Sequence, residues 1–429
     1  MRSSSTSVSP VTRRLFLAFS GVAAAGALGL GATRVDWSQL LDAAATNPLD
    51  PAAGVLVVVT LYGGNDGLNT VVPAADPAYQ AARPDLAYRP DEVLDLGEGL
   101  GLNPGLTGLK ALWDGGQLAV VRGVGYPQAD RSHFRSMAIW QTASPVSSST
   151  TGWLGRWLDA TSTDPLAAVS LESVLPALLA GEKVAAASFP LGGLRLPKGQ
   201  LGGALQLLGR PDPADGPWQA RVATSLADLQ RAASTLGPAT ERRPPAAGPS
   251  AAEPDEGDEQ QDKGASAGGA GQLGAQLDVV ANLIELGVPT RAYSVSLGGF
   301  DTHSDERATQ QRLLTQLDAA LSGFQRRCHG TDRGQQVVVL VYSEFGRRVR
   351  ANGSDGTDHG TAGPVFLLGR GVRGGFHGAE PSLTDLDDGD LKHSTDFRSV
   401  YASVLDGVLG TDPGRVLDGW SGRVDGLLA

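Results

Sequence analysis

The chain contains very little sulfur and few imidazoles. Among its 429 residues there are one cysteine, Cys328, two methionines and six histidines. A single cysteine excludes an internal disulfide, so the stability of the protein must come from a buried core. Any metal site must draw on aspartate, glutamate and those few histidines rather than on a set of thiolates.

Positive charge is also in short supply. The sequence has 35 lysines and arginines against 46 aspartates and glutamates, which gives a formal net charge of −11. Binding to a phosphate backbone requires a positive face, and the chain has no long basic run. The composition therefore argues against a nucleic-acid partner, and the acidic balance is typical of a protein that stays soluble.

Long apolar runs are scarce, and the one that approaches the length of a membrane span lies at the N-terminus. Arg13 and Arg14 stand directly before residues 15–32, which carry no charge and are rich in alanine and glycine. Paired arginines followed by a weakly apolar run are typical of a twin-arginine export signal. If this signal stays uncleaved, the same run would anchor the protein in a membrane.

The signal predicts where the protein works. We expect residues 1–45 to be a signal peptide and linker, with residues 43–45 (three alanines) as a candidate cleavage point. The twin-arginine translocase would then be a partner during export. The mature protein would be periplasmic, displayed on the cell surface or extracellular.

Runs of β-branched residues alternate with segments of helical periodicity. Apolar residues at every position indicate strands that are buried on both faces, as in a parallel sheet covered by helices. Strands are predicted at residues 54–61, 117–121, 291–297, 336–342 and 365–368, and helices at 272–286 and 308–324. The pattern predicts one α/β domain over residues 46–429, a three-layer sandwich with a mostly parallel central sheet.

Residues 237–271 interrupt this pattern. They combine prolines, a run of acidic residues and a stretch of glycine, alanine and serine. Such a composition cannot bury enough apolar area to fold, so we expect a disordered surface insertion here.

Polar residues gather directly after the predicted strands, where open α/β sheets bind their ligands. Asp66 follows the first strand in a glycine-rich turn, and Ser132 stands at the start of a predicted helix. A hydroxyl at a helix N-terminus faces unpaired amides, which favours an anion or an activated nucleophile. The alternatives are a turn cap for Asp66 and a plain N-cap for Ser132.

The later strands are followed by carboxylates and imidazoles. Asp301 and His303 are two residues apart, and this pairing suits zinc or manganese. A hydrogen-bonded Asp–His pair in a turn is the alternative. Glu344 and His359 add two further ligand types, and the planar fork of Arg347 could hold an anionic group or make a surface ion pair.

Five segments in this order resemble the bacterial domain of unknown function 1501 family. They are Gly63-Gly64-Asn65-Asp66-Gly67-Leu68-Asn69, Arg131-Ser132-His133-Phe134, Phe300-Asp301-Thr302-His303, Ser343-Glu344-Phe345-Gly346-Arg347 and Gly356-Thr357-Asp358-His359-Gly360. Members of that family are typically exported, and their activity is mostly undefined. The family looks like a distant branch of the alkaline phosphatase and sulfatase superfamily, which implies an alkaline-phosphatase-like fold.

The resemblance also implies roles for single residues. Ser132 would match the superfamily's nucleophile, and the metal ligands would be Asp66, Asp301, His303, Glu344 and His359. The superfamily places a histidine directly after the strand-end acid, where this chain has Phe345. One ligand of a second ion is therefore missing unless His133 or Asp358 replaces it.

These observations lead to two hypotheses of different classes. The first is an exported hydrolase of small phosphate or sulfate esters that uses one or two divalent ions, zinc or manganese before calcium or magnesium. Ser132, His133 and Arg347 would be its catalytic residues, with Arg347 holding the substrate anion. The second is a non-catalytic exported binding or cell-surface protein on a degenerate fold, for which Phe345 is the best support.

Overall fold

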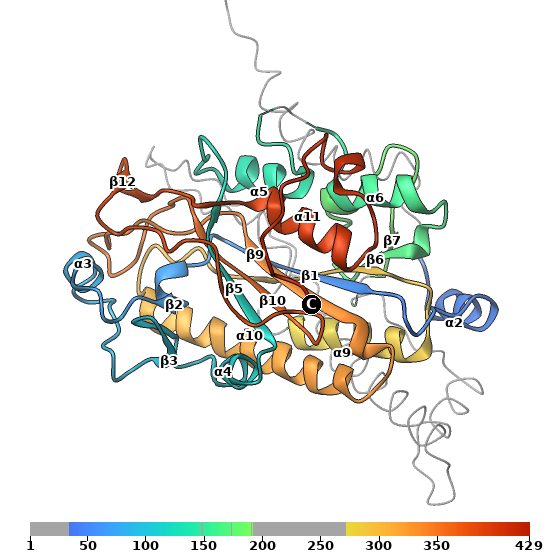
Figure 1. Cartoon of the computed structure of the whole chain (residues 1–429), viewed down its shortest axis with the longest axis horizontal. Helices are drawn as coiled ribbons and strands as arrows, with labels where there is room; N and C mark the ends of the chain where they lie inside the picture. The colour runs from blue at the N-terminus through green and yellow to red at the C-terminus, as the bar shows by residue number, and fades with distance from the viewer. Residues whose placement is uncertain (1–33, 147–148, 173, 190, 192–271) are drawn as a thin grey trace, which may run out of the picture.

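The computed structural model describes residues 34–146, 149–172, 174–189, 191 and 272–429 (Figure 1). The predicted signal up to residue 33 and the predicted insertion at 237–271 lie outside the described residues. Among the helices of the described part, none has both the length and the apolar character needed to cross a membrane.

The predicted buried runs form neighbouring strands of one sheet. β1 (Val55–Tyr62) pairs in parallel with β8 (Ala292–Gly298) on one side and with β9 (Val337–Ser343) on the other. All residues of β1 before Tyr62 are buried, because helices cover both faces of the sheet. The five strands expected from β-branched runs are confirmed, with their ends shifted by one or a few residues.

Within the described residues this sheet has nine strands, in the order β11-β5-β10-β9-β1-β8-β6-β7, with β14 beside β5. β10 is antiparallel to both of its neighbours, and the other pairings are parallel. The remaining strands are β5 (Leu118–Gly125), β6 (Ala168–Ser170), β7 (Ala187–Ser188), β10 (Gly363–Leu368), β11 (Gly375–His377) and β14 (Thr395–Asp396). The mostly parallel sheet is therefore confirmed.

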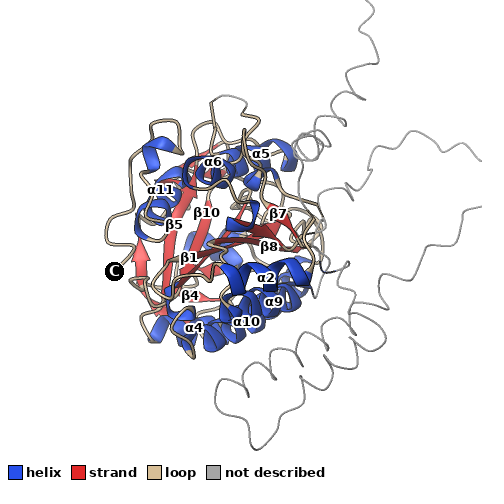
Figure 2. Cartoon of the chain, turned by 90° about the vertical axis from the view of Figure 1, so that its right-hand side faces the viewer, coloured by secondary structure: helices blue, strands red, loops and turns tan. Residues whose placement is uncertain are grey.

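Helices cover the sheet on both faces and complete a three-layer sandwich (Figure 2). One layer holds α2 (Trp37–Thr46), α4 (Thr107–Asp114), α9 (Gln272–Leu286) and α10 (Glu306–His329), and the other holds α5 (His133–Thr142), α6 (Trp153–Thr161) and α11 (Phe397–Gly407). Each layer has its own apolar core, because alternate residues of the strands point to opposite faces. A third, smaller apolar cluster lies beside the main cores and includes Tyr79 of α3 (Pro77–Ala82) and Val72 of β2 (Val71–Val72). β2 belongs to a small sheet with β3 (Leu94–Gly97) and β4 (Leu100–Leu102).

The folded unit begins before the predicted boundary at residue 46. α2 starts with a capping box formed by Asp36 and Gln39, and its Leu40 is fully buried in the core. The backbone N–H of Val35 donates to the carbonyl of Ser188 at 3.2 Å. The three alanines proposed as a cleavage point therefore lie inside a packed helix, and the domain extends at least to Arg34.

The topology brings the polar motifs to one edge of the sheet. β1, β5, β8 and β9 all run in the same direction, so the segments that follow them leave from the same edge. β10 runs in the opposite direction, so the loop that precedes it arrives at that edge too. Carboxylates and imidazoles from four distant parts of the sequence meet there, which is where ligands bind in open α/β sheets.

Candidate metal centre

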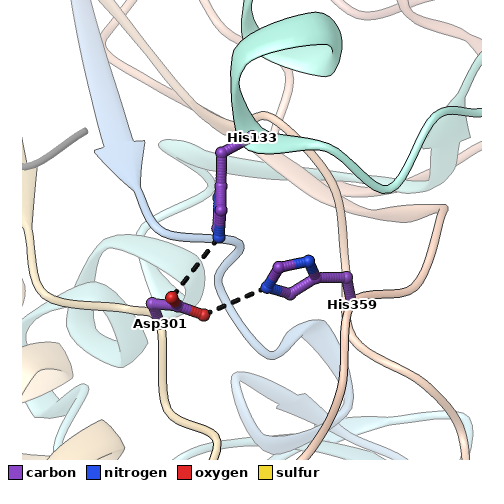
Figure 3. Close-up of side chains that lie close together, drawn as sticks. All are labelled: His133, Asp301 and His359. Carbon is purple, nitrogen blue, oxygen red and sulfur yellow. Dashed lines mark hydrogen bonds and ion pairs between the residues drawn. The ribbon is translucent and has the colours of Figure 1, made fainter. Parts of the chain in front are cut away.

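Three imidazoles converge at this edge around one carboxylate. Asp301 and His303 follow β8, His359 precedes β10, and His133 is the first residue of α5. Figure 3 shows His133 and His359 pointing toward Asp301 from two different segments of the chain. We call His133, Asp301, His303 and His359 the Asp301 cluster.

The nitrogen and oxygen atoms of the cluster lie close together. Asp301 Oδ1 is 3.0 Å from His303 Nε2 and 3.2 Å from His359 Nε2, and the two Nε2 atoms are 2.9 Å apart. Asp301 Oδ2 is 3.4 Å from Nε2 of His133. Ligand atoms at 2.0–2.1 Å from a tetrahedral zinc ion lie roughly 3.3 Å from one another, so this spacing suits such an ion.

All three imidazoles are held through Nδ1 and present Nε2 to Asp301. Nδ1 of His133 donates to Glu344 Oε1 at 2.8 Å, and Nδ1 of His359 donates to the backbone carbonyl of Arg131 at 2.8 Å. Nδ1 of His303 lies 3.2 Å from Asp358 Oδ1. A histidine that binds a metal almost always donates its other N–H in this way, which fixes the tautomer and the orientation of the ring.

This arrangement requires a positive charge at its centre. With Nδ1–H bonded to a carbonyl oxygen, which can only accept, a neutral His359 carries a lone pair on Nε2. The same holds for His303 with Nδ1 bonded to Asp358. Two such lone pairs at 2.9 Å repel each other unless a proton or a metal cation lies between them.

Without a metal, protons fill that role. Burial lowers the pKa of His133, but Asp301 and Glu344 outweigh it and raise the pKa to about 9. The hydrogen bond to Asp301 likewise raises the pKa of His303. Burial alone would raise the pKa of Asp301, yet the histidines and Arg347 hold it well below its usual range. A divalent cation would displace these protons, so its binding should strengthen as the pH rises.

A buried nitrogen of the cluster has no hydrogen-bond partner among the described residues. The side chain of His133 is only 10% exposed, and its Nε2 makes no hydrogen bond, although Asp301 Oδ2 lies 3.4 Å away as an ion-pair partner. A buried polar atom without a partner is costly, and a bound ion would satisfy it. Ligand atoms of His133, Asp301 and His359 all lie within 4.8 Å of one another, so the residues present fit a metal.

Glu344 is an anchor rather than a direct ligand, which corrects the sequence prediction. Its Oε1 accepts from the backbone N–H of Gly63 at 2.9 Å as well as from His133, and its Oε2 accepts from Ser343 Oγ at 3.0 Å. Both carboxylate oxygens are therefore occupied. The Glu344 side chain is 1% exposed and sets the position of His133.

Asp358 also lies outside the cluster itself. It accepts hydrogen bonds from His303 and from Nδ2 of Asn352 at 3.3 Å, and its side chain is 57% exposed. Burial raises its pKa, but these hydrogen bonds and the charges of His303 and Arg348 together lower it below its usual value, so it stays ionised as an acceptor. Its role is to orient His303. The sequence had offered it as a replacement for the ligand that is missing at Phe345.

Asp66 is not part of the cluster, because Arg83 takes its carboxylate. It is fully buried in an ion pair with Arg83, and it caps the short turn at Gly67–Asn69. Arg83 also donates to the carbonyls of Val349 and Arg348. The prediction of Asp66 as a metal ligand is therefore wrong, and the turn-cap alternative describes it better.

Arg347 is buried among acceptors of the protein itself, which contradicts its predicted role in holding a substrate anion. Its guanidinium is 0% exposed and donates to Asp301 Oδ1 at 2.7 Å. Its other acceptors, at 2.5–2.9 Å, are the backbone carbonyls of Gly63, Gly64, Phe300 and Thr357. Arg347 joins the loops after β1 and β8 to the His359 loop, and the planar fork suits this task.

Phe345 forms an apolar wall against two of the imidazoles. Its ring centroid lies 4.9 Å from that of His133 and 4.9 Å from that of His359, and the residue is buried. Gly64, at φ +72°, lies directly beneath the ring, because a Cβ there would approach it to 2.2 Å. The wall fixes the planes of the imidazoles from the side opposite to solvent.

Ser132 stands between His133, which belongs to the cluster, and Arg131, whose backbone carbonyl accepts from His359 of the cluster. It precedes His133, follows Arg131 and is exposed at the N-cap of α5. Its side chain makes no capping hydrogen bond, so the plain N-cap alternative is not what the structure has. Its backbone N–H donates to Asp130 Oδ1 at 2.8 Å. The hydroxyl is available at the positive end of a helix.

Fold and site together define a class: an α/β sandwich with a histidine–carboxylate centre at the carboxyl edge of its sheet. The model of the family described as "Protein of unknown function (DUF1501)" matches residues 122–427, and the chain belongs to that family. None of the curated proteins matches it.

One similar solved structure is the phosphonate monoester hydrolase SpPMH from Silicibacter pomeroyi. The two sequences are 12% identical, and the similarity covers 86% of this chain and 75% of that chain with a TM-score of 0.33. A likeness this distant does not transfer an activity, so the function must be argued from the residues of the site.

Proposed function

We propose that the protein is an exported, metal-dependent hydrolase of small phosphate or sulfate esters. The observation that supports this most is the set of three imidazoles, each anchored through Nδ1 and each presenting Nε2 to Asp301. Nitrogen and carboxylate ligands suit zinc or manganese, with zinc first because of the short spacing. His133, His303, His359 and Asp301 would hold one ion.

The exposed side of the cluster gives a substrate access. Asp301 and His303 are each 45% exposed, whereas Phe345 and Glu344 close the other side. When bound, the ion would neutralise the oxygens of the ester and lower the pKa of an attacking hydroxyl. The substrate would enter between α5 and the loop after β8.

Ser132 is the proposed nucleophile. Its Oγ would lose its proton to water and attack the phosphorus or sulfur atom, and the bond from that atom to the alcohol oxygen would break as the alcohol leaves with a proton taken from water. Water would then attack the serine ester, which releases phosphate or sulfate and restores the hydroxyl. The first-turn amides of α5 would stabilise the negative charge on the transferred group.

Metal binding is tested before turnover. Protein purified without chelator should contain about one zinc or manganese per chain, and removal of the ion should lower its melting temperature. Asp301→Asn and His359→Ala should reduce the metal content by more than tenfold. The proposal fails if the metal-free protein gains no thermal stability from zinc, manganese, calcium or magnesium.

Turnover is then tested with one nucleophile variant and one control. A screen of aryl phosphate and sulfate esters should show hydrolysis by the wild type and a loss of at least a thousandfold in Ser132→Ala. Ser421→Ala serves as the control, because Ser421 is exposed and far along the sequence from the cluster segments. Equal activity of Ser132→Ala and the wild type would refute the nucleophile assignment.

A second candidate function has specific support. Asp66 is buried in an ion pair with Arg83, and Arg347 donates to backbone carbonyls. A predicted metal ligand and a predicted substrate-binding group therefore stabilise the fold instead. A non-catalytic exported protein that keeps the centre as a structural metal site would have these features. It would bind one ion per chain and hydrolyse none of the esters.

A further inference from the structure

A cleft of about 390 Å³ lies beside the Asp301 cluster. Its walls come from the loop before α5 and from the hairpin of β12 (Leu386–Asp387) and β13 (Asp390–Leu391). The residues that matter here are Arg131, Thr361, Asp387, Asp388, Asp390 and Lys392. This volume falls in the range of small-molecule sites.

One hydrogen bond connects the cleft to the cluster, and a second joins two residues of the cleft wall. The carbonyl of Arg131 accepts from His359 Nδ1 at 2.8 Å, so the residue that lines the cleft also holds a ligand imidazole. Thr361, just after His359, donates through Oγ1 to the carbonyl of Leu391 at 2.6 Å. A group bound in the cleft would therefore lie next to the segments that carry the cluster.

The cleft contains a buried carboxylate oxygen without a partner. Asp390 has a side chain that is 1% exposed, and its Oδ2 accepts from Arg131 Nε at 2.8 Å. Its Oδ1 makes no hydrogen bond among the described residues, and the nearest cation, Arg348 Nε, is 3.8 Å away. A buried carboxylate oxygen needs a hydrogen-bond donor, and the protein supplies none here.

The charges around this oxygen favour a cation. Asp387, Asp388 and Asp390 line the cleft against the two basic residues Arg131 and Lys392. The basic groups around it are already engaged, because Lys392 pairs with Asp385, and Arg131 and Arg348 each pair with Asp388 and Asp390. With Asp385 and Arg348 counted, four carboxylates face three basic groups. The lining therefore has a surplus of negative charge and an acceptor without a donor.

We propose that this cleft binds the alcohol half of the ester and that Asp390 selects an alcohol carrying a protonated amine. The ammonium group donates to Asp390 Oδ1 and compensates the surplus charge, while the ester group reaches the Asp301 cluster. The identity of the ligand as the alcohol half of an ester rests on the proposed hydrolase function. The binding of an amine by the cleft does not depend on turnover.

The direct test uses D-glucosamine, with D-glucose as the neutral match that has a hydroxyl in place of the amine. Calorimetric titration of the full chain at pH 7 should show D-glucosamine binding at least fivefold more tightly than D-glucose. Asp390→Asn keeps an acceptor for Arg131 and should abolish that preference. Asp91→Asn removes the same charge from an exposed pair with Arg89 and should leave the preference intact.

Two further arms keep the test decisive. Asp387→Asn leaves the Arg131–Asp390 pair untouched and should weaken D-glucosamine binding about threefold, which covers the case in which Asp390→Asn fails to fold. Equal binding of the two sugars, or no binding of either, would overturn the proposal.

Hydrolysis separates this proposal from the proposed function. Glucosamine 6-phosphate should have a KM at least fivefold below that of glucose 6-phosphate, with the difference lost in Asp390→Asn. Equal KM values with good turnover would overturn the cleft proposal alone. D-Glucosamine binding by a protein that hydrolyses neither ester would overturn the hydrolase function and leave the cleft as an amine site.

Discussion

Replacing Glu344 with glutamine tests how the Asp301 cluster is built. In the structure Glu344 accepts from His133 Nδ1 and from Gly63 N–H through the same oxygen and is not itself in the cluster. Glutamine keeps that oxygen and the size of the side chain but removes the charge. The hydrogen bond to His133 then loses its charge assistance, and the ring loses basicity at Nε2.

The size of the effect follows from that role. Loss of a group that orients a metal-binding histidine typically costs 10–100-fold in metal affinity, or roughly 1.4–2.7 kcal/mol. Competition titration with a zinc chelator at pH 7.5 measures this for Glu344→Gln and the wild type. Affinity unchanged within twofold would refute the anchoring role, and a loss above about a thousandfold would restore Glu344 as a direct ligand.

Three further predictions concern the frame around the site. Leu40→Ala should lower the free energy of unfolding in urea by about 2–5 kcal/mol, because Leu40 is fully buried in α2; a loss below about 1 kcal/mol would mean that α2 is not part of the folded unit. Arg347→Lys should cost at least about 3 kcal/mol, because lysine cannot satisfy the carbonyls that the guanidinium joins; wild-type stability with a raised KM would return Arg347 to the substrate. Burial and the neighbouring Asp66 raise the pKa of Glu306 to about 9, so the folded state holds a proton that the unfolded state releases above about pH 4.5. The free energy of unfolding should fall as the pH rises from 5 to 9, and Glu306→Gln should flatten that fall in a pH series of urea denaturation. Equal slopes for Glu306→Gln and the wild type would contradict a proton held by Glu306 in the folded state.

The strands of the sheet, and the edge at which the site residues meet, could be predicted from the sequence. Runs such as that of β1 are apolar at every position, and only a sheet covered on both faces explains this. Once these strands are parallel, the residues after them must share an edge, and Asp301, His303 and His359 do meet there. The domain start could also have been found, because Asp36 and Gln39 have the spacing of a capping box.

The roles of the individual residues within the site could not be predicted in the same way. A sequence lists carboxylates but does not say which partner each one meets, and Asp66 meets Arg83 through the folding of an intervening loop. Arg347 is buried because three loops converge on it, which no local pattern indicates. His133 was placed among the catalytic residues and offered only as a replacement ligand, yet its anchored Nδ1 and the 3.4 Å contact of its buried Nε2 with Asp301 put it in the cluster.

The central claim is that the Asp301 cluster holds a metal ion, and anomalous scattering from crystals of protein purified without chelator tests it most directly. We expect one strong anomalous peak per chain, at the zinc or manganese edge, surrounded by Nε2 of the cluster histidines and the carboxylate of Asp301. Well-ordered crystals with no peak at the cluster, even after soaking in zinc and manganese, would contradict it.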